Sequence, residues 1–283
     1  MIRTVGFSYE RYNGICSESD RYINIGIYDC FGYGPGYDVP FPERYRLIKE
    51  AGFDCVMLWW SDRFGRGKDY RKDAEYARNA GLRIENMHAP VHEQDFLFTD
   101  NDDGESVFRD YLRCIVDCRT FDIPTVVIHL PGDKYPMTGT GIDRLERLIA
   151  MAGEYNVDIA FENLRNIGNL SIVLERFDIP NVGFCYDTCH HANYAPDTDL
   201  PALYADRLKA LHLHDNGGSR GQHRLPFDGH VDWDTVTGKI KAAGYKGAVT
   251  LEPMNWDYTH TDIRGFLSLA YERARKLEQM IFR

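Results

Sequence analysis

The sequence predicts an α/β fold, a single (β/α)8 barrel of the TIM type with a short N-terminal extension. Two observations support this prediction. Short apolar runs that end in polar residues recur along the chain, and segments with helical periodicity separate them. This alternation continues over roughly 250 residues, the usual size of one such barrel. The alternative, a doubly wound open sheet, lacks support because no Gly-x-Gly-x-x-Gly motif follows an early strand.

The predicted strands begin at residue 22, so residues 1–21 form the extension and residues 22–283 form the barrel. A second interpretation stays open, in which TVGFSY at 4–9 is the first strand and residues 10–40 form a loop rich in tyrosine and glycine. The expected strands are short apolar runs bounded by turn signals. They lie at 22–29, 53–60, 82–90, 124–130, 157–164, 182–190, 208–215 and 247–253.

The segments between these strands carry the helical pattern. Residues 106–121 and 141–155 place apolar side chains at positions i, i+3, i+4 and i+7, which form one face of a helix. The segment 68–81 ends at Gly81, the residue type that most often terminates a helix. The expected helices lie at 42–52, 68–81, 106–121, 141–155, 199–208, 231–245 and 261–277.

Composition restricts the classes of function. The chain has 283 residues and a formal net charge of −10, from 43 acidic and 33 basic residues. Strong non-specific binding to nucleic acid or to an anionic membrane needs a basic surface and is therefore disfavoured. Seven cysteines, an odd number in a chain too long to need disulfides, together with no charged-then-apolar leader, lead us to expect a reduced, cytoplasmic protein.

Five of the predicted strands carry polar side chains near their carboxyl ends, at positions that face the barrel axis. Side chains alternate across a strand, so the bulky apolar residues suit the helix-facing side and the residues between them face the barrel axis. The inward polar residues are His129, Glu162, Asp187, His212, His214 and Glu252. The carboxyl end of the strands is the face where barrels of this type carry out chemistry.

Three carboxylates that converge in a partly dry site repel one another unless a cation offsets their charge. A divalent metal ion with mostly oxygen ligands and one imidazole fits this set. His212 and His214 lie about 6.6 Å apart along an extended strand, so they are not equivalent ligands. Periodicity does not choose between them, and it leaves the metal open among Mn, Zn, Co and Mg.

Several short sequence motifs contain these residues and point to a known family. They are IAFEN, CYDTCH, LHLHDN followed by HRLPFDGHVDW, and VTLEP, with MHAP and IHLPGD upstream. Together and in this order they resemble the xylose-isomerase-like superfamily of TIM barrels. That superfamily includes sugar and sugar-phosphate isomerases and epimerases, and the apurinic-site endonucleases. The resemblance covers nearly the whole chain beyond about residue 22.

The resemblance implies roles for individual residues. It implies a single divalent metal ion held by Glu162, Asp187, His212 and Glu252, with Glu162 and Glu252 also the catalytic bases. His88, His129, His190, His214 and His223 are the expected substrate-binding residues. The implied activity is a metal-dependent isomerase or epimerase of a sugar or sugar phosphate, in which protons are transferred through a metal-stabilised enediolate.

Two other activities stay open. One is a zinc-dependent hydrolase of the apurinic-site endonuclease type, and the other is a dehydratase of a polyol ketone. The sequence departs from the endonuclease pattern at Gly221, where that family carries a metal-binding aspartate. We expect a small carbohydrate substrate and neither nucleic acid nor membrane as a partner, and the sequence is compatible with a homo-oligomer.

The remaining notable residues are expected to serve structure. The glycine-rich aromatic segment 31–37 is either a lid or an irregular loop. Trp59 and Trp60 are adjacent on a strand, so they should face opposite ways. His191, His230 and His260 are expected on the surface or in loops, Asp232 and Trp233 at the start of a helix, and Cys185 inside the barrel one layer below Asp187.

Overall fold

The computed structural model describes residues 24–32, 39–62 and 67–283. The predicted extension at 1–21, the alternative first strand at 4–9 and most of the segment 31–37 lie outside the described residues. Within the described ranges no helix is both long and apolar enough to cross a membrane. The six cysteines of these ranges are all buried free thiols.

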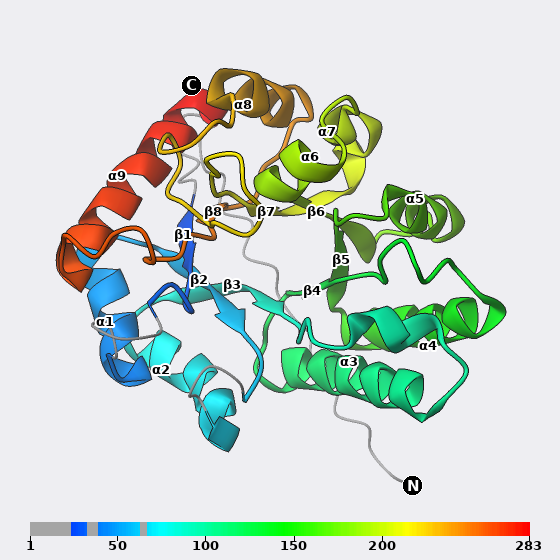
Figure 1. Ribbon diagram of the computed structural model, residues 1–283. Coiled ribbons are helices and arrows are strands. Elements are labelled where there is room, and N and C mark those ends of the chain that lie inside the picture. The colour runs from blue at the N-terminus through cyan, green and yellow to red at the C-terminus, as the bar shows by residue number, and fades with distance from the viewer. Residues whose placement is uncertain (1–23, 33–38, 63–66) are drawn as a thin grey trace, which may run out of the picture.

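Eight parallel strands form the barrel, and their order around the sheet is β7-β6-β5-β4-β3-β2-β1-β8 (Figure 1). The strands are β1 (Ile25–Tyr28), β2 (Cys55–Trp59), β3 (Arg83–His88), β4 (Thr125–Ile128), β5 (Asp158–Glu162), β6 (Val182–Asp187), β7 (Leu208–His212) and β8 (Val249–Leu251). The barrel closes between β7 and β8 through Leu213, whose N–H donates to Thr250 O and whose carbonyl accepts from Glu252 N, each at 3.0 Å. The predicted (β/α)8 fold is confirmed.

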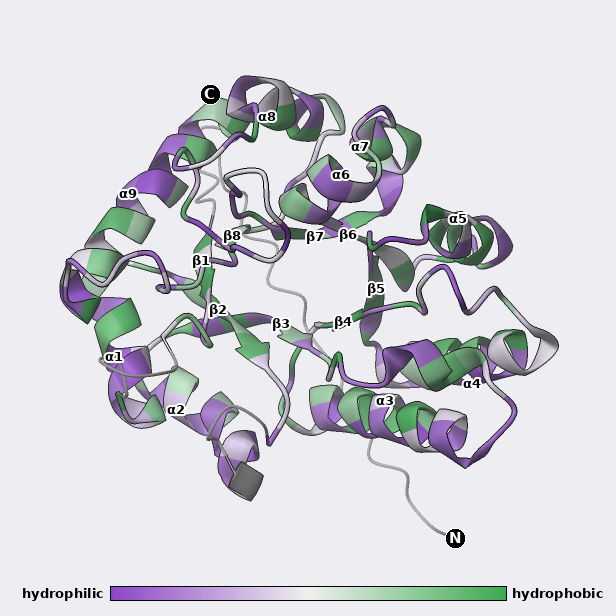
Figure 2. Cartoon of the chain, viewed as in Figure 1, coloured by the Kyte–Doolittle hydropathy of each residue, from purple (hydrophilic) through white to green (hydrophobic). Residues whose placement is uncertain are grey.

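The helices pack around the outside of the strands (Figure 1). They are α1 (Phe41–Ala51), α2 (Asp73–Asn79), α3 (Asp102–Thr120), α4 (Gly139–Tyr155), α5 (Ile167–Arg176), α6 (Thr188–Tyr194), α7 (Leu200–Leu203), α8 (Trp233–Ala242) and α9 (Ile263–Phe282). Figure 2 shows hydrophobic and hydrophilic residues alternating along α3 and α9, as expected of helices that cover a sheet with one face.

Several helical segments differ from the prediction. α6 begins at Thr188, where the strand was predicted to continue to residue 190, and the first part of the helix predicted at 68–81 is a 3₁₀ segment, Gly67–Lys72. α5 was missed, although Asn166 caps it by accepting from Asn169 N at 2.9 Å and its apolar face is buried. The helix predicted at 199–208 is wrong in length. It consists of the four-residue α7 and a 3₁₀ turn at Ala205–Arg207, because the chain already enters β7 at Leu208.

The barrel strands separate two apolar regions of different character. Large side chains such as Ile159, Phe161 and Phe184 face the helices and join the main core. Small side chains face the barrel axis, where Val127, Ala160, Cys185 and Ala210 form one buried layer. The predicted alternation of inward and outward residues is confirmed, including Cys185 as interior filler.

The amino end of the barrel interior contains a half-buried acid, Glu85 on β3. It accepts a hydrogen bond from the Thr250 hydroxyl. Burial raises the pKa of Glu85 to about 7. Gly26 on β1 leaves room for this pair, since a Cβ there would lie 2.7 Å from Thr250 Oγ1 and 2.9 Å from Cys55 Sγ.

Candidate metal centre

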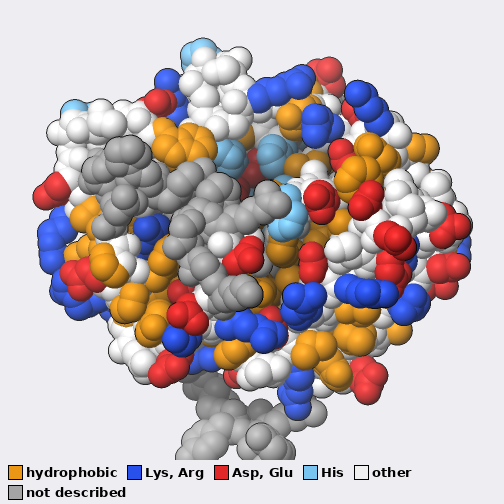
Figure 3. All heavy atoms as spheres, turned by 60° about the horizontal axis from the view of Figure 1, so that its bottom comes forward, with side chains coloured by type: hydrophobic (Ala, Val, Ile, Leu, Met, Phe, Trp, Pro, Cys, Tyr) orange, Lys and Arg blue, Asp and Glu red, His pale blue; other side chains and the backbone are white. Residues whose placement is uncertain are grey.

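The structure brings all nine predicted site residues together at the carboxyl end of the barrel. Figure 3 shows histidine side chains around a hollow with acidic atoms at its floor. The residues are His88, His129, Glu162, Asp187, His190, His212, His214, His223 and Glu252. They come from the ends of the six strands β3 to β8, from α6 and from the loop after β7, so segments far apart in sequence contribute to one site.

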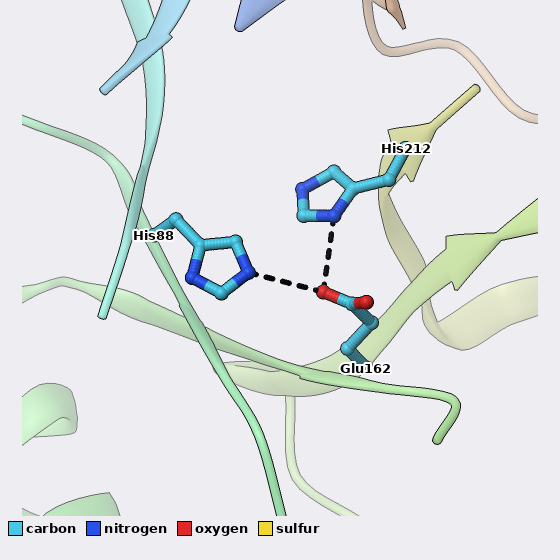
Figure 4. A group of neighbouring side chains, drawn as sticks. All are labelled: His88, Glu162 and His212. Atoms are coloured by element: carbon cyan, nitrogen blue, oxygen red, sulfur yellow. Dashed lines mark ion pairs between the residues drawn. The ribbon is translucent and has the colours of Figure 1, made fainter. Parts of the chain in front are cut away.

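Glu162, at the end of β5, is the centre of the arrangement. Figure 4 shows its carboxylate between His88 and His212, whose nearest nitrogens lie 3.4 and 3.0 Å from Oε2. Two more imidazoles approach the same carboxylate, with His129 Nε2 3.2 Å from Oε2 and His190 Nδ1 2.9 Å from Oε1. Four imidazoles therefore surround one buried carboxylate.

Asp187, at the end of β6, is held on both sides. Its Oδ1 accepts from His190 N at 2.7 Å and so caps α6, while Oδ2 lies 2.8 Å from His214 Nε2. Asn163 on the neighbouring strand fixes its backbone, since the amide side chain accepts from Asp187 N and donates to Asp187 O. These contacts leave Asp187 little freedom to rotate.

Glu252 follows β8 and completes the ring of carboxylates. Its Oε2 lies 3.6 Å from His212 Nδ1 and also 3.6 Å from His214 Nε2. Both histidines of the β7 end therefore reach the same carboxylate. Of the two, His212 offers a ring nitrogen within 4.8 Å of carboxylate oxygens of both Asp187 and Glu252. His212 also approaches Glu162.

The three carboxylates differ in their affinity for protons. Burial opposes ionisation of Glu162, but His129 and His212 outweigh it and hold the pKa of Glu162 well below its usual range. For Asp187, His190 and His214 likewise outweigh burial and keep the pKa low. Burial and then the charge of Glu162 raise the pKa of Glu252 well above its usual range. Without a further cation, the site does not accommodate three negative charges.

The donor set fits a divalent cation. Several buried atoms of the predicted ligands have no hydrogen-bond partner among the described residues, among them Glu162 Oε2, Glu252 Oε2 and both ring nitrogens of His212. Buried polar atoms without partners are rare in folded proteins and point to an unfilled interaction. Carboxylate oxygens and one imidazole are ligands that Mn, Zn, Co and Mg accept.

His214 and His223 form a separate pair. Their rings stack in parallel, with centroids 4.1 Å apart and an interplanar angle of 4°. The lone pairs of parallel rings lie in parallel planes and do not meet at one point, so these two imidazoles are not ligands of the same ion in this arrangement. His223 Nδ1 lies 3.1 Å from the Glu252 carbonyl. Because a carbonyl only accepts, Nδ1 carries the proton and Nε2 is left as an acceptor.

The other histidines have different environments. Burial lowers the pKa of His129 to about 4 and that of His223 to about 3. For His190, burial is outweighed mainly by Asp187, and its pKa is raised. The prediction that His191 lies on the surface is wrong. α6 turns His191 inward, where its ring nitrogens lie 2.6 Å from Tyr186 Oη and 2.7 Å from Thr198 O.

Other predicted structural roles are confirmed. Trp59 faces the site, with its ring centroid 5.4 Å from that of His88, whereas Trp60 faces outward and donates to Asp117 at 2.7 Å. Asp232 caps α8, and Trp233 is buried at its start. His230 and His260 are exposed.

A sequence model described as a xylose isomerase-like TIM barrel matches residues 45–268. The chain belongs to the xylose isomerase-like TIM barrel family. Among its relatives, an uncharacterised protein of Sinorhizobium fredii is 34% identical over 288 aligned residues, which cover 87% of this chain and 91% of the relative. An uncharacterised protein of Methanocaldococcus jannaschii is 29% identical over 126 residues, 39% of this chain and 42% of that protein.

Solved structures show the same fold at low sequence identity. A D-tagatose 3-epimerase-like protein matches with a TM-score of 0.69 and 18% identity, over 92% of this chain and 98% of that one. A D-allulose 3-epimerase from Methylomonas sp. matches with a TM-score of 0.71 and 15% identity, over 90% and 98%. A fusion of a xylose isomerase-like TIM barrel with 4-hydroxyphenylpyruvate dioxygenase has a TM-score of 0.72 and 17% identity. This chain spans 43% of the fusion's length, and 92% of this chain is covered.

Sequence reasoning gave too small a role to two site residues. Asn163, within the word IAFEN, fixes the Asp187 backbone, and an amide directly after a strand-end carboxylate was the available signal. Asp215, within LHLHDN, organises the loop after β7. Three of its four hydrogen bonds come from residues 12 to 18 positions further along the chain, which no local pattern reveals.

Proposed function

We propose that this family member is a metal-dependent isomerase or epimerase of a sugar or sugar phosphate. One observation carries the proposal. Glu162, Asp187 and Glu252 converge with His212 in a buried site where several of their ligand atoms lack hydrogen-bond partners among the described residues. Family membership and a fold shared with proteins named as D-allulose and D-tagatose-like 3-epimerases support the same class of reaction.

Glu162, Asp187, His212 and Glu252 are the residues that would hold the metal ion. A bound divalent cation would supply a Lewis acid that polarises the substrate carbonyl and offsets the charge of the three carboxylates. Asn163 and His214 orient Asp187, because Asn163 bonds its backbone and His214 Nε2 lies 2.8 Å from its Oδ2.

Glu162 and Glu252 are the residues proposed to move protons. They project from β5 and from the end of β8, on different sides of the barrel mouth, so a substrate between them meets a carboxylate on each face. One removes the proton on the carbon next to the carbonyl, and the other returns a proton. Glu252 holds a proton more tightly than Glu162, which suits one carboxyl to donate while the other accepts.

The histidines are proposed to orient the substrate hydroxyls. His223 presents Nε2 as an acceptor because Nδ1 donates to the Glu252 carbonyl. His190 is partly exposed at the mouth and lies beside both Glu162 and Asp187. His88 and His129 complete the wall around Glu162.

The test is a screen of ketoses and their phosphates with metal-loaded protein in deuterated water. We expect deuterium to enter the carbon next to the carbonyl as the product forms, and NMR detects this exchange directly. The Glu162→Gln protein serves as the negative control. No exchange with any ketose or phosphate by protein shown to bind one metal ion per chain would contradict the proposal.

A zinc-dependent hydrolase of the apurinic-site endonuclease type is the second candidate. One observation favours it, because His88 Nε2 and His129 Nε2 both approach Glu162 Oε2 and the three side chains could hold a second cation. Metal counting by mass spectrometry separates the candidates. One ion per chain supports the isomerase, whereas two or three zinc ions with cleavage of DNA at apurinic sites would support the hydrolase.

A further inference from the structure

Asp215 is a fully buried carboxylate that accepts four hydrogen bonds. Its Oδ1 accepts from Asn216 N at 2.8 Å and from Val231 N at 3.0 Å. Its Oδ2 accepts from Phe227 N at 3.0 Å and from Trp233 Nε1 at 2.8 Å. The donors are spread over the segment from 216 to 233, so one side chain joins the beginning, middle and end of the loop that follows β7.

This loop, residues 216–231, returns to Asp215 at its centre. The backbones of Asp215 and Arg224 pair in antiparallel fashion, with each N–H 2.8 Å from the other's carbonyl oxygen. His223 is the residue directly before Arg224. The pairing that Asp215 anchors therefore fixes the chain one residue away from a site imidazole.

The loop adopts a conformation that needs external support. His223 and Phe227 have φ angles of 45° and 73°, in the left-handed region that most residues avoid. The Phe227 N–H is one of the four donors to Asp215. Gly229 passes so close that a Cβ would lie 2.2 Å from Asp215 Oδ1. The carboxylate is therefore enclosed tightly by the loop that it binds.

His223 reaches the site through this loop. Its backbone carbonyl accepts from Met254 N at 2.7 Å, its Nδ1 donates to Glu252 O, and its ring lies parallel to that of His214. All three contacts depend on the position of residues 222–224 over the barrel mouth. None of them is made by Asp215 itself.

We propose that Asp215 is a positioning residue, which holds the loop 216–231 in the conformation that places the His223 imidazole beside His214 and Glu252. Asp215 acts through His223 and does not touch the reacting atoms. The inference about position rests on the contacts alone, and only its kinetic consequence rests on the proposed function.

Three variants weaken the hydrogen bonds between Asp215 and the loop 216–231 to different extents. Asp215→Asn turns one acceptor into an N–H₂ group that faces two donors, so about half of the bonds are lost. Gly229→Ala leaves Asp215 unchanged but forces a methyl group against Oδ1 and Asn216 O. Trp233→Phe removes a single donor. Asp232→Asn is the matched control, because Asp232 is exposed and its carboxylate bonds Thr235 at the start of α8, away from Asp215.

The first measurement is the tautomer of His223, read from its ring ¹⁵N shifts in the full chain without substrate. The contact with Glu252 O predicts the Nδ1–H tautomer in the native protein and in Asp232→Asn. Asp215→Asn and Gly229→Ala should give a mixture of tautomers, and Trp233→Phe a smaller change. An unchanged His223 signal in folded Asp215→Asn and Gly229→Ala protein would overturn the proposal whatever the enzyme's substrate.

The second measurement is a double-mutant cycle with His223→Ala on the substrate found by the screen. His223→Ala should lower kcat/KM by about 10- to 100-fold, the usual effect of losing one hydrogen bond to a buried polar group. Asp215→Asn should produce a similar loss in the native background and at most about a twofold loss in the His223→Ala background. Metal affinity should stay within about twofold of native, because Asp215 contacts no proposed ligand directly.

Additive losses in the cycle, or a parallel loss of metal binding, would show a general structural role and refute the positioning assignment. Should Asp215→Asn fail to fold, Gly229→Ala and Trp233→Phe test the same prediction in milder form. A shifted His223 tautomer with no activity on any ketose would uphold Asp215 as the positioning residue and count against the proposed function instead.

Discussion

Two layers of side chains in the barrel interior, which lie two residues apart along the same strands, have opposite chemistry. The lower layer consists of Val127, Ala160, Cys185 and Ala210, which are small, apolar and fully packed. Two residues further along the same four strands come His129, Glu162, Asp187 and His212. These side chains are polar, and several of their buried atoms have no hydrogen-bond partner among the described residues. The lower layer serves packing, and the upper layer retains unfilled interactions for a ligand.

The comparison predicts that changes in the upper layer affect turnover more than stability. Glu162→Gln and Glu252→Gln should each lower kcat by at least about 10³-fold, because each removes a carboxylate proposed to transfer a proton. The fold should be retained, since glutamine has nearly the same size and shape as glutamate and keeps an oxygen that accepts hydrogen bonds. The measurements are the rate of deuterium exchange and the thermal midpoint. Glu154→Gln, on the exposed side of α4, is the control, and near-native turnover in either site variant would remove that residue from the mechanism.

Glu85 offers a stability test at the amino end of the same interior. Its pKa is raised to about 7 from 4.5, so the unfolded chain releases this proton at lower pH than the folded chain. Stability from this group is therefore lost as pH rises from about 4.5 to 7, by up to about 3 kcal/mol. Glu85→Gln should be more stable than the native protein at pH 8 and equal to it at pH 4. Urea unfolding at both pH values measures the difference, and an equal difference at the two would contradict the assigned cause.

Overpacking the lower layer should lower stability by a smaller amount. Ala160→Leu adds three carbon atoms to a filled interior and should cost about 1–3 kcal/mol of unfolding free energy. Ala242→Leu, on the exposed side of α8, should change stability by less than about 0.5 kcal/mol. Denaturant unfolding compares the two. Equal changes in unfolding free energy for Ala160→Leu and Ala242→Leu would mean that the lower layer has room for a larger side chain.

Replacing Cys185 should have the smallest effect on stability. Cys185 lies in the lower layer, two residues before the proposed metal ligand Asp187. Cys185→Ala removes one buried sulfur and should destabilise the protein by about 1 kcal/mol. Metal content and kcat should stay within about twofold of native, because the thiol faces the lower layer. Metal analysis and the exchange assay measure both. Loss of the bound metal would contradict this and give Cys185 a role in the site.

The sequence predicted the barrel and the convergence of the site because both follow from periodicity. Alternation along a strand decides whether Glu162 faces the axis or the helices, and the strand ends bring such residues to one face. The same periodicity could not separate His212 from His214, since both share one phase. The family resemblance favoured His212 as the ligand, and the contacts distinguish the two, with His212 beside Glu162 and His214 beside Asp187.

The failures occurred where local pattern and tertiary contact disagree. His191 was expected on the surface or in a loop, but α6 turns it inward onto Tyr186. The segment 199–208 has helical composition, yet the entry into β7 ends the helix after Leu203. Asp215 lies in a recognisable motif, but three of its four donors lie 12 to 18 residues further along the chain, beyond the reach of local periodicity.

The barrel's closure has a consequence for how the site is assembled. The last strand pairs with the first through a regular ladder, but it meets β7 only through the two backbone bonds of Leu213. This narrow seam lies directly beneath His212 and His214 on one side and Glu252 on the other. A cation shared by Glu252 and the ligands of β5 to β7 would link β8 to β7 and so stabilise the contact between the two ends of the sheet. Folding and metal binding should therefore be coupled most strongly at this joint, and local opening in the metal-free chain should begin there.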